Sequence, residues 1–538
     1  MPEAPASTTR AHPETQTLGR AVRATGLVTL GSRVFGMVRD VLIGRIFGDT
    51  ATGSAFAAAF AVPNMFRRLF GEGALSAAFV PEYAQAHKHD APLAGQLASL
   101  TLRWLGLATG VLTAVIEVGL LMVLVFAPGD AERRLSITLL MVMLPFMPMI
   151  CLAAILAGML QVHNRFAAAA SGPILLNAFI IVTGLYFVLV GGRGDATIAY
   201  ALGVATVLSG VTQAATFWWM LRKEVAWSRH DARARATAGR MLRTFIPVMI
   251  GLGTLQLSTL IDTVIAMWPI WIGPTMLGRP VPLDEGSNAI ISLTSRLYQF
   301  PLGVFGIAVA TAAFPLMARA ADDPGRFIEV LRRGLRLSLL IGLPASVGLA
   351  LVRHDLVFVL FAGGKGGFSP EGVARASSVL LGFSTAIWAY SLNHVLTRGF
   401  YARKDTRTPM RVAIVMVLVS VGLNFTLIWP LREAGLAWAT AVSQVIQTVV
   451  LLVLAGRKLH AGAILDGPTR QAMARTAGMV LAMGVCVWGV LHVWPAVVLW
   501  REHALRLGVA AGVGMAVYGG MCVGLRVPEL AWLRGRGG

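Results

Sequence analysis

The chain has 538 residues, of which 56% are hydrophobic and only 13% are charged. Soluble domains carry roughly a quarter charged residues, so this composition excludes a soluble globular protein, a disordered chain and a secreted disulfide scaffold. The 46 Lys and Arg residues outnumber the 26 Asp and Glu residues and give a formal net charge of +20. In so apolar a chain we interpret the excess as basic cytoplasmic loops of a multi-pass membrane protein, and we expect no nucleic-acid partner.

The predicted elements are membrane-spanning helices. Residues 1–20 are polar and predict a disordered tail rather than a signal peptide. About 20 mostly apolar residues cross a bilayer, and about 14 segments of the chain reach that length. The first two segments are unusually polar, and Pro63 is expected to break the helix of the second one. The fourteen segments lie near 22–47, 51–82, 98–127, 137–160, 167–191, 197–221, 245–271, 288–318, 335–362, 374–397, 412–430, 434–455, 477–499 and 505–525. The sequence therefore predicts an all-α polytopic membrane protein.

The distribution of basic residues predicts the orientation of these spans. With a cytoplasmic N-terminus, 29 of the 46 Lys and Arg residues fall on the cytoplasmic side, 10 on the opposite side and 7 inside spans. Cytoplasmic loops of membrane proteins carry such an excess. We therefore expect both termini in the cytoplasm, and we expect the basic loop 223–243 to contact anionic membrane lipids.

Two pairs of segments indicate an internal repeat. Residues 70–79 (FGEGALSAAF) resemble residues 305–314 (FGIAVATAAF) at an offset of 235, and residues 158–164 resemble residues 399–405 at a similar offset. We interpret this as two six-helix lobes in parallel orientation followed by two C-terminal helices, with chance similarity in Ala-rich sequence as the alternative. Parallel repeats are typical of transporters. The predicted parts are an N-lobe (21–222), a basic linker (223–243), a C-lobe (244–456), a C-terminal helix pair (457–527) and a C-terminal tail (528–538).

The basic residues inside spans are the strongest functional signal. An Arg at the bilayer centre costs about 2.5–3.5 kcal/mol even on translocon scales, so such residues usually line a wet cavity or face a partner. Because Arg binds phosphate bidentately, the predicted ligand is a phosphate or diphosphate. The alternative is that these side chains reach the membrane interfaces or pair with acids. The residues that we expect to bind the ligand are Arg33, Arg39, Arg67, Arg68 and Arg296.

Fewer acids lie inside the spans. Asp40 is expected to pair either with an arginine of its own span or with another helix, and Arg68 and Glu72 have the spacing of a helical ion pair. Asp262 is a candidate for pairing with an arginine, for ion coupling, or for a protonated carboxyl. Asn424 and Thr440 are oxygen donors that would complete a cation site with it. The spacing of His and Cys predicts no structural metal site.

Several motifs closely resemble the MurJ (MviN) family. They are SRVFGMVRD (32–40), RIFG (45–48), PNMFRRLFGEGALSAAFVP (63–81), FPLGVFGIA (300–308) and GFYARKDTRTP (399–409). Members are bacterial lipid II flippases of the MATE-like branch of the MOP exporter superfamily. The resemblance implies fourteen helices in the inner membrane, with a groove at the last two helices for a polyprenyl tail.

The resemblance also implies a mechanism. The five arginines would hold the diphosphate of undecaprenyl-diphosphate-linked disaccharide-pentapeptide in a central cavity during alternating access, supported by Ser32, Asp40, Asn64 and Glu72. Asp262 matches an acid that belongs to a sodium site in some members. The resemblance implies a transporter without enzymatic activity or cofactor that is driven by Na⁺, H⁺ or the membrane potential. Its implied partners are lipid II, membrane lipids and the cell-wall synthesis machinery. Ser54, Ser295 and Gln299 depart from the family, because many members have acids there.

Three other functions stay open at this point. One is the export of another polyprenyl-diphosphate oligosaccharide, and a second is cation-coupled multidrug export. Drug exporters would favour acids in their cavity, whereas arginine dominates in this chain. The third is an integral membrane enzyme acting on polyprenyl phosphates, but the one adjacent pair of aspartates, Asp322 and Asp323, lies in a predicted cytoplasmic loop.

Overall fold

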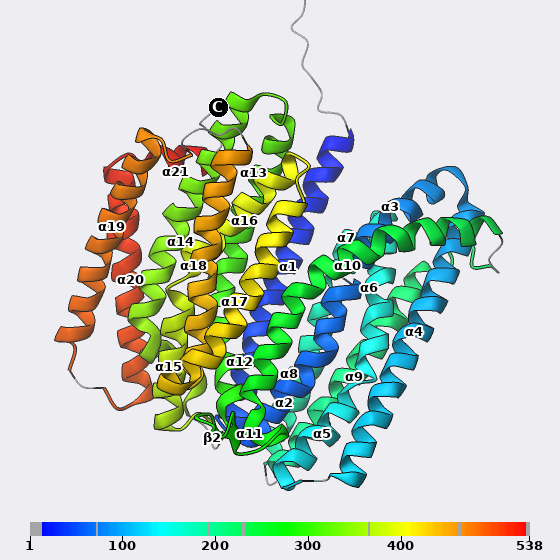
Figure 1. Cartoon of the computed structure of the whole chain (residues 1–538), viewed down its shortest axis with the longest axis horizontal. Coiled ribbons are helices and arrows are strands. Elements are labelled where there is room, and N and C mark those ends of the chain that lie inside the picture. Colours follow the sequence, from blue (N-terminus) through cyan, green and yellow to red (C-terminus); the bar gives the residue numbers. More distant parts are fainter. Residues whose placement is uncertain are drawn as a thin grey trace, which may run out of the picture. The chain divides into compact units, whose positions relative to one another are not determined.

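The computed structural model describes residues 13–71, 74–127, 129–191, 194–228, 232–363, 366–459, 464–495 and 497–533. This described part is almost entirely helical, as Figure 1 shows. Its β-structure consists of one short antiparallel pair, β1 (Thr275–Met276) and β2 (Arg279–Pro280). The predicted all-α fold class is confirmed.

The helices of the first half, in chain order, are α1 (Pro13–Phe47), α2 (Ala51–Phe66), the π-helical turn η1 (Arg67–Gly71), α3 (Ala74–His89), α4 (Ala91–Phe126), α5 (Ala131–Met143), α6 (Phe146–Val162), α7 (Phe166–Ala170), α8 (Gly172–Val190) and α9 (Asp195–Leu221). Those of the second half are α10 (Ala232–Ala266), α11 (Trp268–Trp271), α12 (Ser287–Pro301), the π-helical turn η2 (Leu302–Gly306), α13 (Ile307–Arg319), α14 (Pro324–Phe361), α15 (Pro370–Ser384), α16 (Ile387–Ala402), α17 (Arg407–Leu431) and α18 (Glu433–Lys458). The chain closes with α19 (Gly467–Val493), α20 (Trp500–Gly524) and α21 (Pro528–Leu533).

The helices confirm a multi-pass membrane protein. Within the described residues, 10 helical segments are long and apolar enough to cross a membrane. The predicted spans outside this group are α1, the α2–η1–α3 segment, α10 and the α12–η2–α13 segment. Each of these four contains in-span charges, an irregular turn or a strongly basic end. The count of fourteen spans therefore stays a prediction.

The chain divides into two compact units. Unit 1 consists of the described parts of Met1–Arg39, Val62–Ala127 and Met141–Leu252, and unit 2 of those of Asp40–Ala61, Pro128–Leu140 and Gly253–Gly538. In unit 1, α6 packs against α9, α4 and α3. In unit 2, α14 packs against α15 and α16, and both α19 and α20 pack against α14. The boundary crosses α1, which therefore contributes side chains to each unit.

The order of elements repeats along the chain. Helix α2 runs into the π-helical turn η1 and α12 runs into the π-helical turn η2, and α3 and α13 are the next helices in the chain. The turn η1 begins at Arg67 and η2 begins at Leu302, which is the same offset of 235 residues that relates the two sequence segments. An irregular turn at equivalent positions is what a repeat predicts, and π-turns are often associated with functional sites.

The second pair of similar segments also has equivalent backbone structure. Both α6 and α16 are followed by a residue with left-handed backbone, Asn164 with φ of 61° and Lys404 with φ of 59°. In each case the next amide donates to the carbonyl five residues earlier, a common way to end a helix. The two hydrogen bonds are Arg165 N to Leu160 O (2.8 Å) and Asp405 N to Phe400 O (3.0 Å).

Two local predictions need correction. Helix α1 begins at Pro13, so residues 13–20 are not the disordered tail that the polar composition predicted; residues 1–12 lie outside the described part. Most residues of 13–20 tolerate a helix, with Pro at its first position, where the missing N–H costs nothing. In addition, Pro63 does not end its helix but lies inside α2, and the irregular turn begins four residues later at Arg67.

Candidate functional site

Arg39 is a buried arginine in unit 1 that the sequence placed in the ligand site. Its side chain is only 9% exposed, and its Nη1 donates to Oδ1 of Asn177 on α8 at 3.0 Å. The Asn177 Nδ2 in turn donates to the backbone carbonyl of Ser32 at 3.2 Å. Asn177 therefore connects two predicted site residues of α1, Ser32 and Arg39. Arg33, also on α1, is half-buried.

Arg67 is the first residue of η1 and is held in a similar way. Its Nε donates to Oδ1 of Asn64, one turn earlier, at 2.8 Å. Asn64 is buried, and Arg68 is half-buried. Glu72, which the sequence placed beside Arg68, lies outside the described residues.

In unit 2, Arg296 on α12 pairs with an acid. Its Nε lies 3.9 Å from Oδ2 of Asp40, so Asp40 pairs with another helix, one of the two arrangements expected for it. Ser54, one of the three positions where the resemblance implied an acid, is fully buried, and its Oγ accepts a hydrogen bond from the Ala289 amide at 3.0 Å. Ser54 thus attaches α2 to the start of α12. Ser295 bonds within its own helix, donating to the Ser292 carbonyl at 2.9 Å.

Two of the three predicted cation ligands lie together in unit 2. The Nδ2 of Asn424 donates to Oδ1 of Asp262 at 2.6 Å. The Asn424 Oδ1 is buried without a hydrogen-bond partner among the described residues, and such an oxygen is a suitable ligand for a hard cation. Thr440 donates to the Leu436 carbonyl of its own helix at 2.9 Å.

An apolar groove of about 450 Å³ lies between α14 and α19 in unit 2. Almost all of its lining is hydrocarbon. The residues that line it include Leu343, Val347, Leu351, Val480, Gly484 and Trp488.

Arg45, another basic residue of the first predicted span, is structural. Its Nε donates to the Leu360 carbonyl at 3.0 Å, and its Nη2 donates to the Val359 carbonyl at 2.8 Å. These carbonyls lie at the C-terminal end of α14, where the helix dipole favours a cation. The Trp500 Nε1 also donates to the Val359 carbonyl, at 3.0 Å. Arg45 therefore stabilises a junction of three helices.

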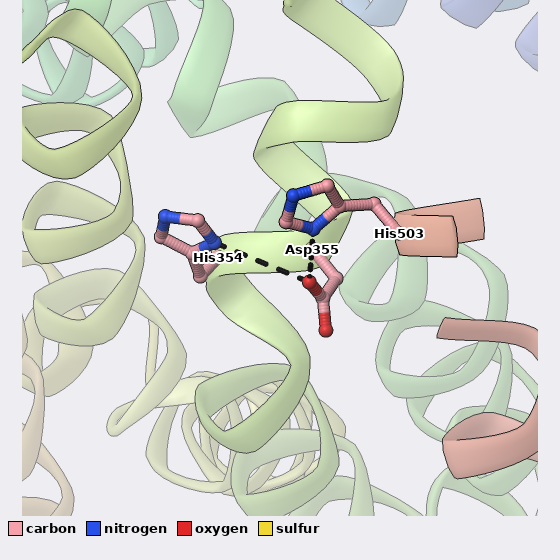
Figure 2. Close-up of side chains that lie close together, drawn as sticks. All are labelled: His354, Asp355 and His503. Atoms are coloured by element: carbon pink, nitrogen blue, oxygen red, sulfur yellow. Dashed lines mark hydrogen bonds and ion pairs between the residues drawn. The ribbon is translucent and has the colours of Figure 1, made fainter. Parts of the chain in front are cut away.

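Sequence reasoning missed an ionic cluster where α14 meets α20. Figure 2 shows the rings of His354 and His503 turned toward one carboxylate oxygen of Asp355. The Nδ1 of His503 lies 2.6 Å from Asp355 Oδ1, and the Nδ1 of His354 lies 4.0 Å from it. Arg506 donates to both oxygens of the same carboxylate, from Nη2 at 2.5 Å and from Nε at 2.8 Å.

Three potential ligand atoms this close raise the question of a metal ion. The Arg506 guanidinium occupies both carboxylate oxygens, and Oδ1 also bonds to His503. A divalent cation would have to displace that hydrogen bond and lie beside a fixed positive charge. The cluster is therefore best described as a buried ion-pair network. His503 and Arg506 follow Asp355 by 148 and 151 residues, so no spacing pattern in the sequence reveals the cluster.

A second cluster that sequence reasoning missed lies in unit 1. His163, directly after α6, bridges α3 and the segment that follows α9. Its Nδ1 lies 3.2 Å from Glu224 Oε2, and its Nε2 lies 2.9 Å from the Tyr83 hydroxyl. The His87 ring is 4.4 Å away between centroids, and Arg165 pairs with Glu224. Burial and the neighbouring His87 lower the pKa of His163, against the opposite effect of Glu224.

We expect this cluster to weaken in acid. Because the folded state favours neutral His163, the unfolded state binds more protons as the pH falls through about 6.5, and the folded state loses stability. The thermal midpoint of the purified protein should fall from pH 7.5 to pH 5.5, and it should fall less in His163→Gln. His492→Gln, which removes an exposed histidine of α19 outside both ionic clusters, serves as the matched control. Equal pH slopes in wild type and His163→Gln would contradict the prediction.

Comparison with known proteins gives concordant results. A family profile described as "Lipid II flippase MurJ" matches residues 43–507. A probable lipid II flippase MurJ of Rhizobium tropici is 32% identical over 93% of this chain and 94% of its own length. The corresponding protein of Vibrio cholerae is 29% identical over 96% of this chain and 98% of its own.

Solved structures share the fold. A lipid II flippase MurJ in an inward closed conformation matches with a TM-score of 0.75 and 20% identity, over 93% of this chain and 98% of that one. An inward-facing multidrug resistance MATE family transporter of the MOP superfamily matches with a TM-score of 0.65 and 13% identity, over 81% of this chain and 98% of that one. With a profile match over most of its length and relatives along nearly all of it, the chain belongs to the MurJ family of lipid II flippases.

Proposed function

We propose that this chain carries lipid II, undecaprenyl-diphosphate-linked disaccharide-pentapeptide, from the cytoplasmic to the periplasmic leaflet by alternating access. The observation that carries the proposal is the family match over residues 43–507, together with relatives of the same name along nearly the whole chain. The chain acts as a transporter and requires neither enzymatic chemistry nor a cofactor.

In this proposal the arginines inside the spans bind the diphosphate. A guanidinium presents N–H groups in a planar fork that matches phosphate oxygens, and it keeps its charge at any physiological pH. Three of these arginines are each held in position by a partner. In unit 1, Asn177 holds the buried Arg39 and Asn64 holds Arg67. In unit 2, Asp40 pairs with Arg296. A positively charged site also disfavours cationic drugs as substrates. The full set of proposed ligands is Arg33, Arg39, Arg67, Arg68 and Arg296, supported by Ser32, Asp40, Asn64 and Glu72.

The groove between α14 and α19 is the proposed site of the polyprenyl tail. Its lining is almost wholly apolar, and an isoprenoid chain offers only hydrocarbon surface in return. Each buried methylene contributes about 0.8 kcal/mol, so even part of a long tail binds appreciably. The groove belongs to unit 2, as Arg296 does.

Coupling to an ion gradient is proposed to involve Asp262. The carboxylate is hydrogen-bonded to Asn424, whose own carbonyl oxygen is available for a cation. This arrangement suits Na⁺ binding by oxygen ligands, with Thr440 as a further ligand after a rotamer change. The alternatives to Na⁺ coupling are H⁺ coupling through protonation of Asp262 and transport driven by the membrane potential. We place the protein in the bacterial inner membrane with both termini in the cytoplasm, in contact with anionic lipids and the cell-wall synthesis enzymes.

The proposed function is tested by asking on which side of the membrane lipid II accumulates. In a strain whose growth depends on this chain alone, depletion should leave lipid II inaccessible to an added enzyme that degrades it from outside. Re-expression of wild type should restore its degradation, whereas an equal amount of Arg39→Ala should not. Unchanged degradation after depletion would overturn the proposed function.

A further inference from the structure

Two arginines of unit 1 share an unusual kind of partner. Arg39 donates to the carboxamide oxygen of Asn177 at 3.0 Å, and Arg67 donates to that of Asn64 at 2.8 Å. Both asparagines are buried, at 4% exposure for Asn177 and 9% for Asn64. A carboxamide accepts a hydrogen bond but carries no charge, so each of these contacts fixes a guanidinium and adds no negative charge beside it.

Arg506 and Arg375, two arginines of unit 2, are held by acids instead. Arg506 binds the carboxylate of Asp355 through two nitrogens, and Arg375 donates to Asp284 at 2.6 Å and pairs with Glu433 as well. An acid beside a guanidinium gives a stronger bond but neutralises the local field. The contacts of Arg39 with Asn177 and of Arg67 with Asn64 thus fix the two guanidinium groups and contribute no negative charge of their own.

The carboxamide of Asn177 has a defined orientation. Its Nδ2 donates to the Ser32 carbonyl at 3.2 Å, and only the amide nitrogen can make that bond. The oxygen must then face Arg39. Gly36 lies between these two contacts on α1, and a Cβ there would come within 3.6 Å of the Asn177 nitrogen. The side chain of Asn177 is thus braced against α1 along two helical turns.

We propose that Asn177, with Asn64, is a positioning residue that orients an anion-binding arginine through a contact that does not itself neutralise the arginine. The bond from Nη1 to Asn177 fixes the plane of the Arg39 guanidinium, which has five N–H groups in all. A fixed plane lowers the entropy lost when phosphate oxygens bind. This inference rests on the proposed function, because it takes the diphosphate of the lipid substrate as the anion.

The test replaces the neutral acceptor by a charged one of the same shape. Purified full-length protein in lipid nanodiscs is titrated with undecaprenyl diphosphate at pH 8, using wild type, Asn177→Ala, Asn177→Asp and Asn64→Asp. Asn177→Ala should bind about tenfold more weakly, because an oriented, charge-assisted hydrogen bond is lost. Asn177→Asp should bind more weakly still, even though it preserves the hydrogen bond to Arg39, and Asn64→Asp should weaken binding in the same way through Arg67.

A pH series separates positioning from simple structural support. Protonation of the carboxyl introduced in N177D restores a neutral acceptor at low pH, so the affinity of N177D should recover relative to wild type as the pH falls. Asn177→Asp also loses the amide that donates to the Ser32 carbonyl, as Asn177→Ala does, so the thermal midpoints of both variants are measured beside their affinities. Asn393→Asp, at a buried asparagine bonded to Gln444 and Thr448, is the matched control and should bind as wild type does.

The outcomes are distinguishable. If wild type binds undecaprenyl diphosphate and N177D binds it equally well, the inference is overturned and the proposed function stands. Weaker binding by N177D that tracks a lower thermal midpoint and does not recover in acid would also overturn it, in favour of a purely structural role. If folded wild type does not bind undecaprenyl diphosphate, the proposed function falls, and the inference falls with it.

Discussion

Arg39→Ala and Arg296→Ala are each expected to abolish growth of a strain that depends on this chain for lipid II export. Each change removes a buried or half-buried positive charge that the proposed mechanism needs for the diphosphate. Loss of one bidentate charged contact costs about 1.5–3 kcal/mol in binding, and more where the site excludes water. Complementation and membrane abundance, measured together in the depletion strain, check this result.

Lysine variants sharpen this prediction. Arg39→Lys keeps the charge but loses the planar fork, so it should restore growth only in part. Arg45→Lys is the matched control in the same helix, because Arg45 binds backbone carbonyls of α14 and is not a proposed ligand of the diphosphate. Normal growth with both alanine variants, at wild-type abundance, would refute the proposed role of the in-span arginines.

Asp355→Ala is expected to produce a large loss of stability in unit 2. The carboxylate is 2% exposed and neutralises Arg506 while it also binds His503. Removing one partner of a buried ion pair typically costs about 3–5 kcal/mol, since the other charge stays buried without compensation. The thermal midpoint of the purified protein should fall by several degrees, and α20 should become more susceptible to proteolysis at its junction with α14.

A double-mutant cycle identifies the cause. If the cost arises from the uncompensated guanidinium, Asp355→Ala combined with Arg506→Met should recover part of the loss that Asp355→Ala causes alone. Glu329→Ala breaks the exposed pair with Arg333 and should leave the midpoint almost unchanged, because exposed ion pairs contribute little. Additive effects of the two changes at the buried cluster would contradict this account.

Much of the fold could be predicted from composition and pattern. Long apolar segments indicated a helical membrane protein, because a bilayer leaves the backbone few other ways to satisfy its hydrogen bonds. The similarity of residues 70–79 and 305–314 predicted a repeat, and the π-helical turns η1 and η2 recur at the same offset. The predicted disordered tail, residues 1–20, extends past the start of α1 at Pro13, because composition does not locate the start of a helix to within a few residues.

The candidate site was only partly accessible to sequence reasoning. The cost of a buried charge marks Arg39 and Arg296 in the sequence itself, because few functions other than ligand binding or ion pairing justify that cost. The sequence could not identify Asn177, since an asparagine in an apolar helix carries no such signal. Its role follows from a contact across 138 residues.

The sequence by itself thus determined the class of protein, its family and the residues whose charge must be explained. Only the tertiary structure decided how those charges are held: Arg39 by the neutral Asn177, Arg296 by the acidic Asp40, and Arg45 by the end of α14. The physical reason is that hydropathy and charge are properties of single residues, whereas the partner of a buried charge depends on which distant helices pack together.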